Sequence, residues 1–352
     1  MGIFDIFKKK KEVKRIKPEN DNKVFLPENG KSEGDIIEID EKKLKEIIYE
    51  WESSEEIINS LLSSADNQTR ENIKFVEYLI NIIDSEKLEI PALPDIIIKI
   101  MKLSQDPDTE ISKYVQVVKS DQAIALKIIK LANSPLYKGL RDVNDLNLAV
   151  SRIGINELKN IVIMMSLQTK IFRGKKFKDL IDEIWKSSLL TALISSQLAS
   201  YYSLDSSRLY TLALLEDVGE IIVLDAVRGY ESFYKMKYKP DEHFILRTAK
   251  SFHQQISAFT LAHWNFSKEQ IRIVRNHHVL PDDKTDEYNK VLFVSYQTAL
   301  IVLKFKFTDS NIENFPYDFI LKFSKLPLKR DAFIILLRKS LKQFNEFISV
   351  LN

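Results

Sequence analysis

The sequence predicts an all-α protein, and three observations support this fold class. Gly (8) and Pro (10) are scarce for a chain of 352 residues. Leu, Ile, Lys and Glu are plentiful, and apolar residues recur at three- and four-residue spacing. We find neither a convincing two-residue alternation of apolar side chains nor a repeat at fixed spacing. We therefore expect a multi-helix bundle whose helices are joined by short loops.

The first 35 residues are expected to form a flexible basic tail. Ile3, Phe4, Ile6 and Phe7 precede a run rich in Lys and Arg, and a segment of this kind can lie on an anionic membrane surface. A solvated leader is the more common role of such a charge run. We therefore expect at most a weak membrane-surface contact through this tail.

Residues 36–88 are expected to form an accessory helical region. Apolar side chains recur there at helical spacing, at positions 44, 47, 48 and 51 and again at positions 73, 76, 79, 80 and 83. Residues 89–285 are expected to form the main domain. Residues 286–352 are expected to be a C-terminal helical extension that packs on its core.

The main domain is expected to begin at a segment shaped by proline. Pro91 and Pro94 stand just before an apolar stripe, where proline can start a helix but cannot lie inside it. Ser120 or Asp121 is expected to cap a later helix. That helix should end at Asn133, because asparagine tolerates the left-handed C-cap conformation.

Further helices follow in the main domain and in the extension. Gly154 is expected to close a helix over residues 146–153, and later helices are expected over residues 157–168, 181–200, 207–224, 241–263, 268–277, 289–307, 317–323 and 329–350. The helices on either side of Gly154 superficially resemble a helix-turn-helix. The second of them is apolar nearly all round, and Lys159 is its only basic residue. A recognition helix needs polar and basic side chains, so we do not expect this one to bind DNA.

Composition excludes several classes of function. Lys+Arg (52) and Asp+Glu (50) nearly cancel, so no field of one sign attracts nucleic acid. The chain has no Cys, which excludes disulfides and thiolate-bound metals. No run reaches the ~20 apolar residues of a membrane span, and no secretory signal or Gly-rich phosphate loop is present. We expect a cytoplasmic protein whose tail makes any peripheral contact with the inner face of the membrane.

Four motifs between residues 90 and 168 point to one family. They are IPALP at Ile90–Pro94, Ser120-Asp121, KIIKLANSPLY at Lys127–Tyr137 and AVSRIG at Ala149–Gly154. Together they resemble the first half of the HDOD family, the non-catalytic relatives of the HD-superfamily hydrolases. The positions that carry this resemblance are Pro91, Pro94, Asp121, Asn133 and Ser134.

Motifs further along the chain extend the resemblance. WKSS at Trp185–Ser188 stands where relatives place Trp-x-His-Ser, and LLEDVG at Leu214–Gly219 stands where they place Leu-Leu-His-Asp-Ile-Gly. His253 precedes Trp264 by eleven residues, as in the family's His…Trp-Asn element, and His277-His278 matches the family's paired histidines. The resemblance therefore implies an HDOD-like bundle whose HD-type helical half is degenerate.

The same resemblance implies a function. HDOD domains act in bacterial signal transduction as non-enzymatic signalling or adaptor proteins, through protein–protein contacts. Partners in cyclic-dinucleotide signalling or motility are implied, and no cofactor is expected. The cyclic-dinucleotide phosphodiesterase branch carries Gly-x-Gly-Tyr-Pro after its paired His; here Val279–Asp283 contains no Gly, which excludes that activity.

The residues at the inherited ligand positions argue against hydrolysis. An HD hydrolase holds a divalent ion with an early His, a His-Asp pair and a late Asp, and the ion activates water. Ser187 stands at the early position, Glu216 replaces the His of the pair, and residues 291–307 contain no Asp or Glu. Only Asp217 remains, so we expect no enzyme and no metal. The alternative is a metal-dependent HD-type phosphohydrolase with a substituted ligand set.

Six residues are expected to mark a vestigial pocket: Ser187, Glu216, Asp217, His253, His277 and His278. Structural roles are the alternative. Asp217 can cap a helix end, and His277 and His278 can bind the carbonyl groups of a last helical turn. His243 and His263 match no motif.

Overall fold

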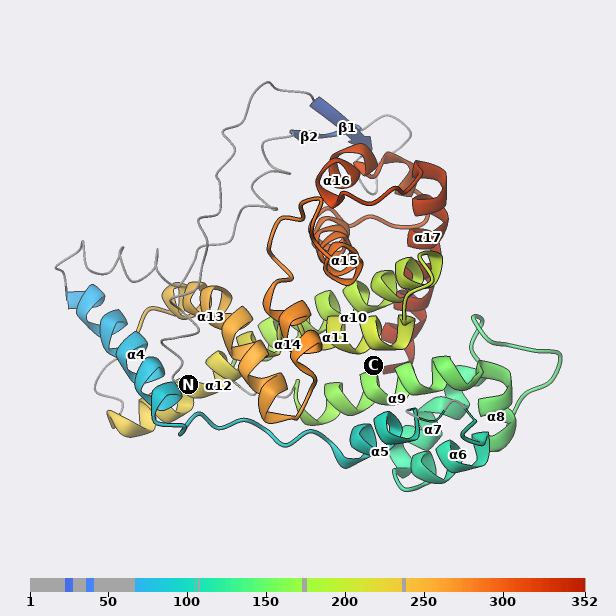
Figure 1. Ribbon diagram of the computed structural model, residues 1–352, viewed down its shortest axis with the longest axis horizontal. Helices are drawn as coiled ribbons and strands as arrows, with labels where there is room; N and C mark the ends of the chain where they lie inside the picture. Colours follow the sequence, from blue (N-terminus) through green and yellow to red (C-terminus); the bar gives the residue numbers. More distant parts are fainter. Residues whose placement is uncertain are drawn as a thin grey trace. The chain divides into compact units, whose positions relative to one another are not determined.

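The computed structural model describes residues 23–27, 36–40, 67–104, 106, 108–172, 176–235 and 239–351 (Figure 1). Within them, the elements are helices α4 to α17, one 3-10 helix and one pair of short strands. The prediction of an all-α fold is confirmed. The membrane contact predicted for the tail falls on residues 3–17, which lie outside the described residues, as do residues 41–66 of the predicted accessory region.

Among the described helices, none combines the length and the apolar character that crossing a bilayer requires.

Two short strands precede the helices. β1 (Lys23–Pro27) pairs antiparallel with β2 (Ile36–Asp40), with Lys23 opposite Asp40 and Pro27 opposite Ile36. Both strands are rich in β-branched and aromatic residues, which favour extended backbone. No pattern in the sequence predicted this pair, because five residues per strand are too few for an alternation to stand out.

The chain divides into two compact units, each made of two separate stretches. The first unit contains Met1–Ile90 and Glu216–His278, and the second contains Pro91–Leu215 and Val279–Asn352. The domain boundaries expected from the sequence, after residues 35, 88 and 285, stay predictions.

Four helices form the described core of the first unit: α4 (Asn67–Asp84), α12 (Val218–Phe233), α13 (Glu242–His263) and α14 (Lys268–Arg275). α12 and α13 lie side by side, α14 packs on α13, and α4 contacts both α12 and α13 (Figure 1). Tyr230 of α12 packs edge-on against Phe75 and Tyr78 of α4, at centroid distances of 5.4 and 5.5 Å. Such aromatic pairs contribute about 0.5–1.5 kcal/mol each, and they fasten α4 to the unit.

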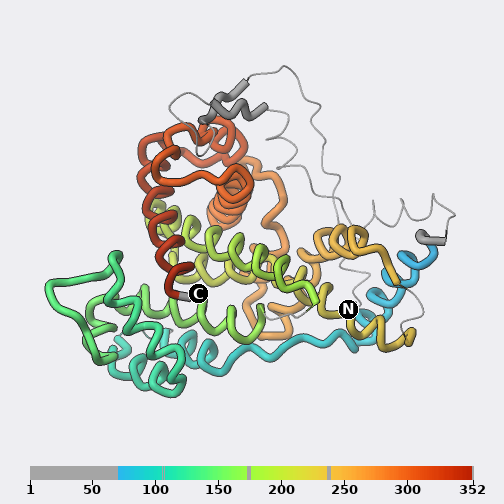
Figure 2. Tube along the Cα trace, turned by 180° about the vertical axis from the view of Figure 1, so that it is seen from behind, coloured from blue at the N-terminus to red at the C-terminus, as the bar shows by residue number. Residues whose placement is uncertain are grey.

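The second unit contains the remaining described helices: α5 (Asp95–Leu103), α6 (Ile111–Lys119), α7 (Gln122–Ala132), α8 (Leu146–Ile153), α9 (Ile155–Lys170), α10 (Lys178–Tyr201), α11 (Ser206–Leu215), α15 (Glu287–Lys304), the 3-10 helix η1 (Ile312–Asn314), α16 (Tyr317–Ser324) and α17 (Arg330–Leu351). α10 is the longest of them and packs against α11, α15 and α17 (Figure 2). α5, α7 and α8 each contact α9.

One predicted helix is divided in the structure. The sequence predicted a continuous helix over residues 207–224, but α11 ends at Leu215 and α12 begins at Val218. That prediction is wrong, and the sequence missed the division because apolar residues recur through the segment without a break. The start of α12 is set by a long-range contact, in which the backbone N–H of Gly219 donates to Ser257 Oγ of α13 at 2.8 Å.

The family-motif positions have structural roles in the second unit. Pro94 is the N-cap of α5, and Asp121 caps α7 by accepting from the backbone N–H of Ile124 at 3.1 Å. Asn133 binds both backbone groups of Val143, donating from Nδ2 at 2.7 Å and accepting at Oδ1 at 2.8 Å. The left-handed C-cap predicted for Asn133 is wrong: its φ is −98°, and its side chain clamps the following loop.

The loop and the helices beyond it follow the same logic. The carbonyl of Ser134 accepts from the backbone N–H groups of Tyr137 and Lys138, at 3.0 and 2.7 Å. Gly154 joins α8 to α9 with a φ of 88°, a conformation that glycine adopts without strain. The prediction that Gly154 closes α8 is confirmed. Most of α9 is buried, as expected, so it does not present a recognition face.

Candidate functional site

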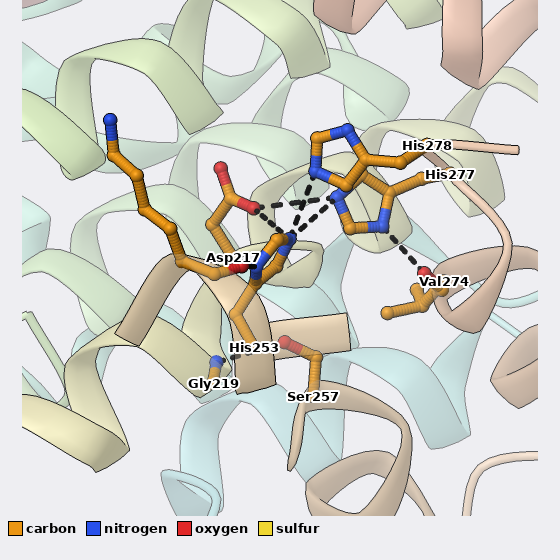
Figure 3. A network of polar contacts seen from close by, with 8 residues as sticks. Asp217, Gly219, His253, Ser257, Val274, His277 and His278 are labelled. Atoms are coloured by element: carbon orange, nitrogen blue, oxygen red, sulfur yellow. Dashed lines mark hydrogen bonds and ion pairs between the residues drawn. The ribbon is translucent and has the colours of Figure 1, made fainter. Parts of the chain in front are cut away.

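Four side chains of the first unit converge on one point, and we call them the Asp–His cluster: Asp217, His253, His277 and His278 (Figure 3). One ligand atom of each lies within 4.8 Å of every other. Asp217, His253 and His277 are buried, and His278 is half-buried. The cluster draws on three places in the unit: the start of α12, the middle of α13 and the segment that follows α14.

The turn between α11 and α12 points Asp217 into the cluster. Asp217 stands at the N-cap position of α12, yet its side chain makes no capping hydrogen bond there. The capping role that the sequence offered for Asp217 is therefore wrong. Its carboxylate is instead directed at the histidines (Figure 3).

Gly219 allows α12 and α13 to approach closely enough for these contacts. A Cβ atom at this position would lie 2.9 Å from His253 Cα and 2.8 Å from the backbone nitrogen of Ser257. Both are backbone atoms of α13, which cannot rotate away as a side chain can. Glycine is therefore required here to place Asp217 beside His253.

Four separations within the cluster are short. Asp217 Oδ1 lies 3.3 Å from His253 Nε2 and 3.4 Å from His277 Nε2. His253 Nε2 lies 3.2 Å from His277 Nε2 and 3.0 Å from His278 Nε2. The Nε2 atoms of all three rings therefore face the centre of the cluster.

The opposite nitrogen of two rings is held by the backbone. His253 Nδ1 contacts the carbonyl oxygen of Lys250, and His277 Nδ1 lies 2.6 Å from the carbonyl oxygen of Val274 (Figure 3). A carbonyl can only accept, so each Nδ1 carries a proton and donates it. Nε2 is then the ring atom that each of these histidines directs at the cluster. The expected contact between His277 and a last-turn carbonyl is confirmed, since Val274 lies in the last turn of α14.

Burial and neighbouring charges shift the pKa values around the cluster. Burial lowers the pKa of His253 to about 4, against the opposing effect of Asp217. Burial alone would raise the pKa of Asp217, but His277 and His253 outweigh it, and the pKa of this carboxyl is lowered. Burial and the charge of Asp217 raise the pKa of Glu220, in the first turn of α12, to about 8.

The structure brings together four of the six residues expected in the pocket. Glu216 precedes Asp217 in the sequence and is fully buried, but its carboxylate is not among the clustered donors. Ser187 is a buried residue of α10 and belongs to the second unit. Glu220, three residues after Asp217, belongs to none of the motifs, so its position is its one sequence signal. Gly219 is part of the LLEDVG motif, but the motif does not show that it lets α12 approach α13.

Comparison with known proteins identifies the domain. The model of the HDOD domain family matches residues 90–280. An uncharacterized protein of Treponema pallidum (strain Nichols) is 25% identical over 240 residues, which are 65% of this chain and 45% of that protein. The chain therefore spans less than half the length of this relative.

Three solved structures share the fold. The "Putative metal-dependent phosphohydrolase" of Shewanella amazonensis SB2B is 20% identical, with a TM-score of 0.58 over 78% of this chain and 99% of that one. An HDOD domain protein of unknown function from Geobacter sulfurreducens is 18% identical, with a TM-score of 0.52 over 80% and 96% of the two chains. The "Putative signal transduction protein" of Marinobacter aquaeolei VT8 is 17% identical, with a TM-score of 0.55 over 81% and 66%.

Proposed function

This chain belongs to the HDOD domain family, and we propose from that membership that it is a non-enzymatic signalling adaptor, which acts through contacts with other proteins. The observation that carries the proposal is the donor set of the HD-type half. Ser187 and Glu216 stand where a hydrolase places histidines, and the span 291–307 offers no carboxylate for the late ligand. A hydrolytic ion needs its ligands and an open position for water.

The geometry of the Asp–His cluster supports the same proposal. Its four donors face one another, and three of the four residues are buried. Catalytic zinc is commonly held by three protein ligands so that water can occupy the fourth position. An ion held by all four donors of the cluster would have no open position for water in a four-coordinate shell.

The partners are proposed to be proteins of cyclic-dinucleotide signalling or motility, and a nucleic-acid partner is not proposed. The name of the Marinobacter aquaeolei protein, which shares the fold, refers to signal transduction. The test is affinity capture of the tagged full-length chain from its native cells, after cross-linking and with identification by mass spectrometry. We expect the wild-type chain and Asp217→Ala to capture the same partner in equal amounts.

A second candidate is the metal-dependent HD-type phosphohydrolase with a substituted ligand set. The Asp–His cluster favours it, because its carboxylate and imidazoles are ligands of catalytic metals. The two functions are separated by measuring the hydrolysis of a generic phosphodiester with Mn²⁺ or Zn²⁺ present. An adaptor leaves the rate at that of buffer alone. Turnover by the wild-type chain that Asp217→Ala abolishes would establish the hydrolase instead.

A cytoplasmic location and a weak peripheral contact through residues 3–17 complete the proposal. The apolar and basic residues of that segment suit an anionic lipid surface. The contact is tested by co-sedimentation with vesicles that contain anionic lipid, comparing the full chain with a variant that lacks residues 3–17. Equal sedimentation of the two would rule the contact out.

A further inference from the structure

We propose that the loop between α7 and α8 docks on an anionic lipid surface, with Leu140 inserted among the lipids and basic residues beside it on the headgroups. This loop comprises residues 133–145 and lies wholly in the second unit, and we call it the Leu140 loop. The inference goes beyond the adaptor function. It also does not depend on the membrane contact proposed for residues 3–17, because it concerns a different part of the chain.

The first observation is the exposure of apolar side chains at this loop. The Leu140 loop extends beyond the two helices that it joins (Figures 1 and 2), and Leu140, near its middle, is fully exposed. Leu126 of α7 and Leu148 of α8 are 61% and 59% exposed, and these two helices lie side by side. One exposed leucine is ordinary on a protein surface. Three of them on one loop and its two flanking helices are a local concentration that suits a docking surface.

The second observation is that side chains hold the base of the loop in place. Asn133 binds both backbone groups of Val143, at 2.7 and 2.8 Å, and so closes the base. The guanidinium of Arg152 donates to the backbone carbonyl of Arg141 at 2.6 Å and to that of Ala132 at 3.1 Å. It thereby ties the end of α7 to the middle of the loop. A loop that is already ordered loses less conformational entropy when it docks.

The third observation is the charge around Leu140. Four basic residues flank it or precede it in α7: Lys127, Lys130, Lys138 and Arg141. No acidic residue occurs from position 122 to position 141. Asp142 and Asp145 come next, and the carboxylate of Asp145 accepts from two backbone N–H groups at the start of α8. Four basic residues against two acidic ones leave this part of the surface positive, which complements anionic headgroups.

The order of residues along the loop fits the layers of a lipid surface. Leu140 stands between two exposed basic residues, Lys138 and Arg141. Long basic side chains can keep their charges at the headgroups while an apolar neighbour lies deeper, among the acyl chains.

The shape of the loop favours lipid over a protein as the partner. A protein would need a pocket that matches the projecting loop, whereas lipids rearrange around any convex segment. An acidic protein surface is the alternative, and the experiments below separate the two.

The first test is co-sedimentation of the full-length chain with vesicles of phosphatidylglycerol and phosphatidylcholine, or of phosphatidylcholine alone. The chain should bind the anionic vesicles and not the neutral ones. Leu140→Ser should lower the partition coefficient about tenfold, because an apolar side chain no longer enters the lipid. Lys138→Gln and Arg141→Gln should each lower it roughly fivefold. Ile335→Ser, at a position 65% exposed on α17, and Lys186→Gln, at an exposed position of α10, are the matched controls and should leave it unchanged.

The second test reports the environment of the loop directly. The chain contains no cysteine, so Leu140→Cys can be labelled at that position alone with an environment-sensitive fluorophore. Its emission should shift to shorter wavelength with anionic vesicles and stay unchanged with neutral ones. His263→Cys, labelled at an exposed position in the first unit, is the control and should show no shift.

Three results would overturn the proposal: no sedimentation of the wild-type chain with anionic vesicles, equal sedimentation of the wild-type chain and Leu140→Ser, or unchanged emission of the label at position 140. Partner capture that Leu140→Ser abolishes, with vesicle binding unchanged, would assign the loop to a protein instead. Deleting residues 3–17 tests the contact of the tail alone, so either membrane contact can fail without the other. Because Leu140 is fully exposed, its substitution should leave the Tm unchanged, and the variants remain folded for these measurements.

Discussion

The two units of this protein each contain a polar cluster, and the clusters differ in how their protons are used. In the second unit, the hydroxyl of Tyr137 donates to Glu157 Oε1 at 3.0 Å, and Gln343 Nε2 donates to the same oxygen at 3.3 Å. Gln197 in turn donates to Gln343 Oε1 at 3.3 Å. We call these four residues the Glu157 network. In the Asp–His cluster, the Nδ1 protons of His253 and His277 point outward to backbone carbonyls, and their Nε2 atoms face each other inside.

The difference lies in the direction of the donors. In the Glu157 network, each acceptor named above faces a donor, so the network is satisfied by the protein alone. In the Asp–His cluster, the Nδ1 donors of His253 and His277 are directed at carbonyl groups outside the cluster. Burial alone would not distinguish the two clusters. The direction of the donors does.

Gly219→Ala is expected to cause the largest loss of stability, and it acts in the first unit. The added Cβ would meet backbone atoms of His253 and Ser257 at 2.9 Å or less, so α12 must move away from α13. Overpacking of this kind costs roughly 3 kcal/mol, and the Tm should fall by about 6 °C. The Glu157 network, whose residues all lie in the second unit, should stay intact.

Gly139→Ala is the matched control, since its Cβ would meet only the guanidinium of Arg152, at 3.3 Å, which can move aside. It should cost less than about 1 kcal/mol. Equal stability of Gly219→Ala and the wild-type chain would refute the close approach of α12 and α13.

A pH-dependent loss of stability is the second expected effect. The pKa of Glu220 is raised from 4.5 to about 8 by burial and by the charge of Asp217. A carboxyl whose folded pKa is raised contributes stability that is complete below its unfolded pKa and is lost as the pH rises through its folded pKa. The urea midpoint should therefore decrease as the pH rises from 5 to 9. A folded-state pKa that lies one pH unit above the unfolded value corresponds to about 1.4 kcal/mol of stability.

Glu220→Gln isolates this contribution, because the amide stays neutral at every pH. Its urea midpoint should change less than that of the wild-type chain over the same range. Parallel pH profiles for the two chains would show that Glu220 titrates normally.

Asn133→Ala is expected to have the third largest effect, and it acts in the second unit alone. It removes two hydrogen bonds to the backbone of Val143, whose side chain is buried. The unpaired N–H and carbonyl groups should cost about 2 kcal/mol in urea unfolding. Asn147→Ala, an exposed asparagine of α8, should change stability by less than about 0.5 kcal/mol. Equal urea midpoints for Asn133→Ala and Asn147→Ala would contradict the role of Asn133 in holding the loop at Val143.

The sequence predicted the local features of this fold well. Helical periodicity and the scarcity of Gly and Pro predicted the all-α class, and the cap at Asp121 and the junction at Gly154 follow from the preferences of single residues. The break before α12 was missed because it depends on the contact of Gly219 with α13, which no local pattern records. The two short strands were missed for want of length.

The candidate site was predicted only as a set of residues. Resemblance to the family placed Asp217, His253, His277 and His278 in one group, and the structure brings them together. The same resemblance added Ser187, which the structure places in the second unit. That the Nε2 atoms of His253 and His277 point inward depends on the carbonyls behind the rings. Backbone groups are present at every position, so the sequence could not show which of them would orient a ring.

Tyr137→Phe should have the smallest effect, and it tests the satisfied cluster directly. It removes the hydroxyl that donates to Glu157 and leaves Gln343 as the remaining donor of the network. The loss should cost about 1 kcal/mol in urea unfolding, the usual net value of one hydrogen bond. Tyr201→Phe, at an exposed position, should cost less than about 0.5 kcal/mol. Because Gln343 can still donate to Glu157, the cost should stay at the value of a single hydrogen bond. A cost as large as that of Asn133→Ala would mean that the Glu157 network is lost as a unit and not bond by bond.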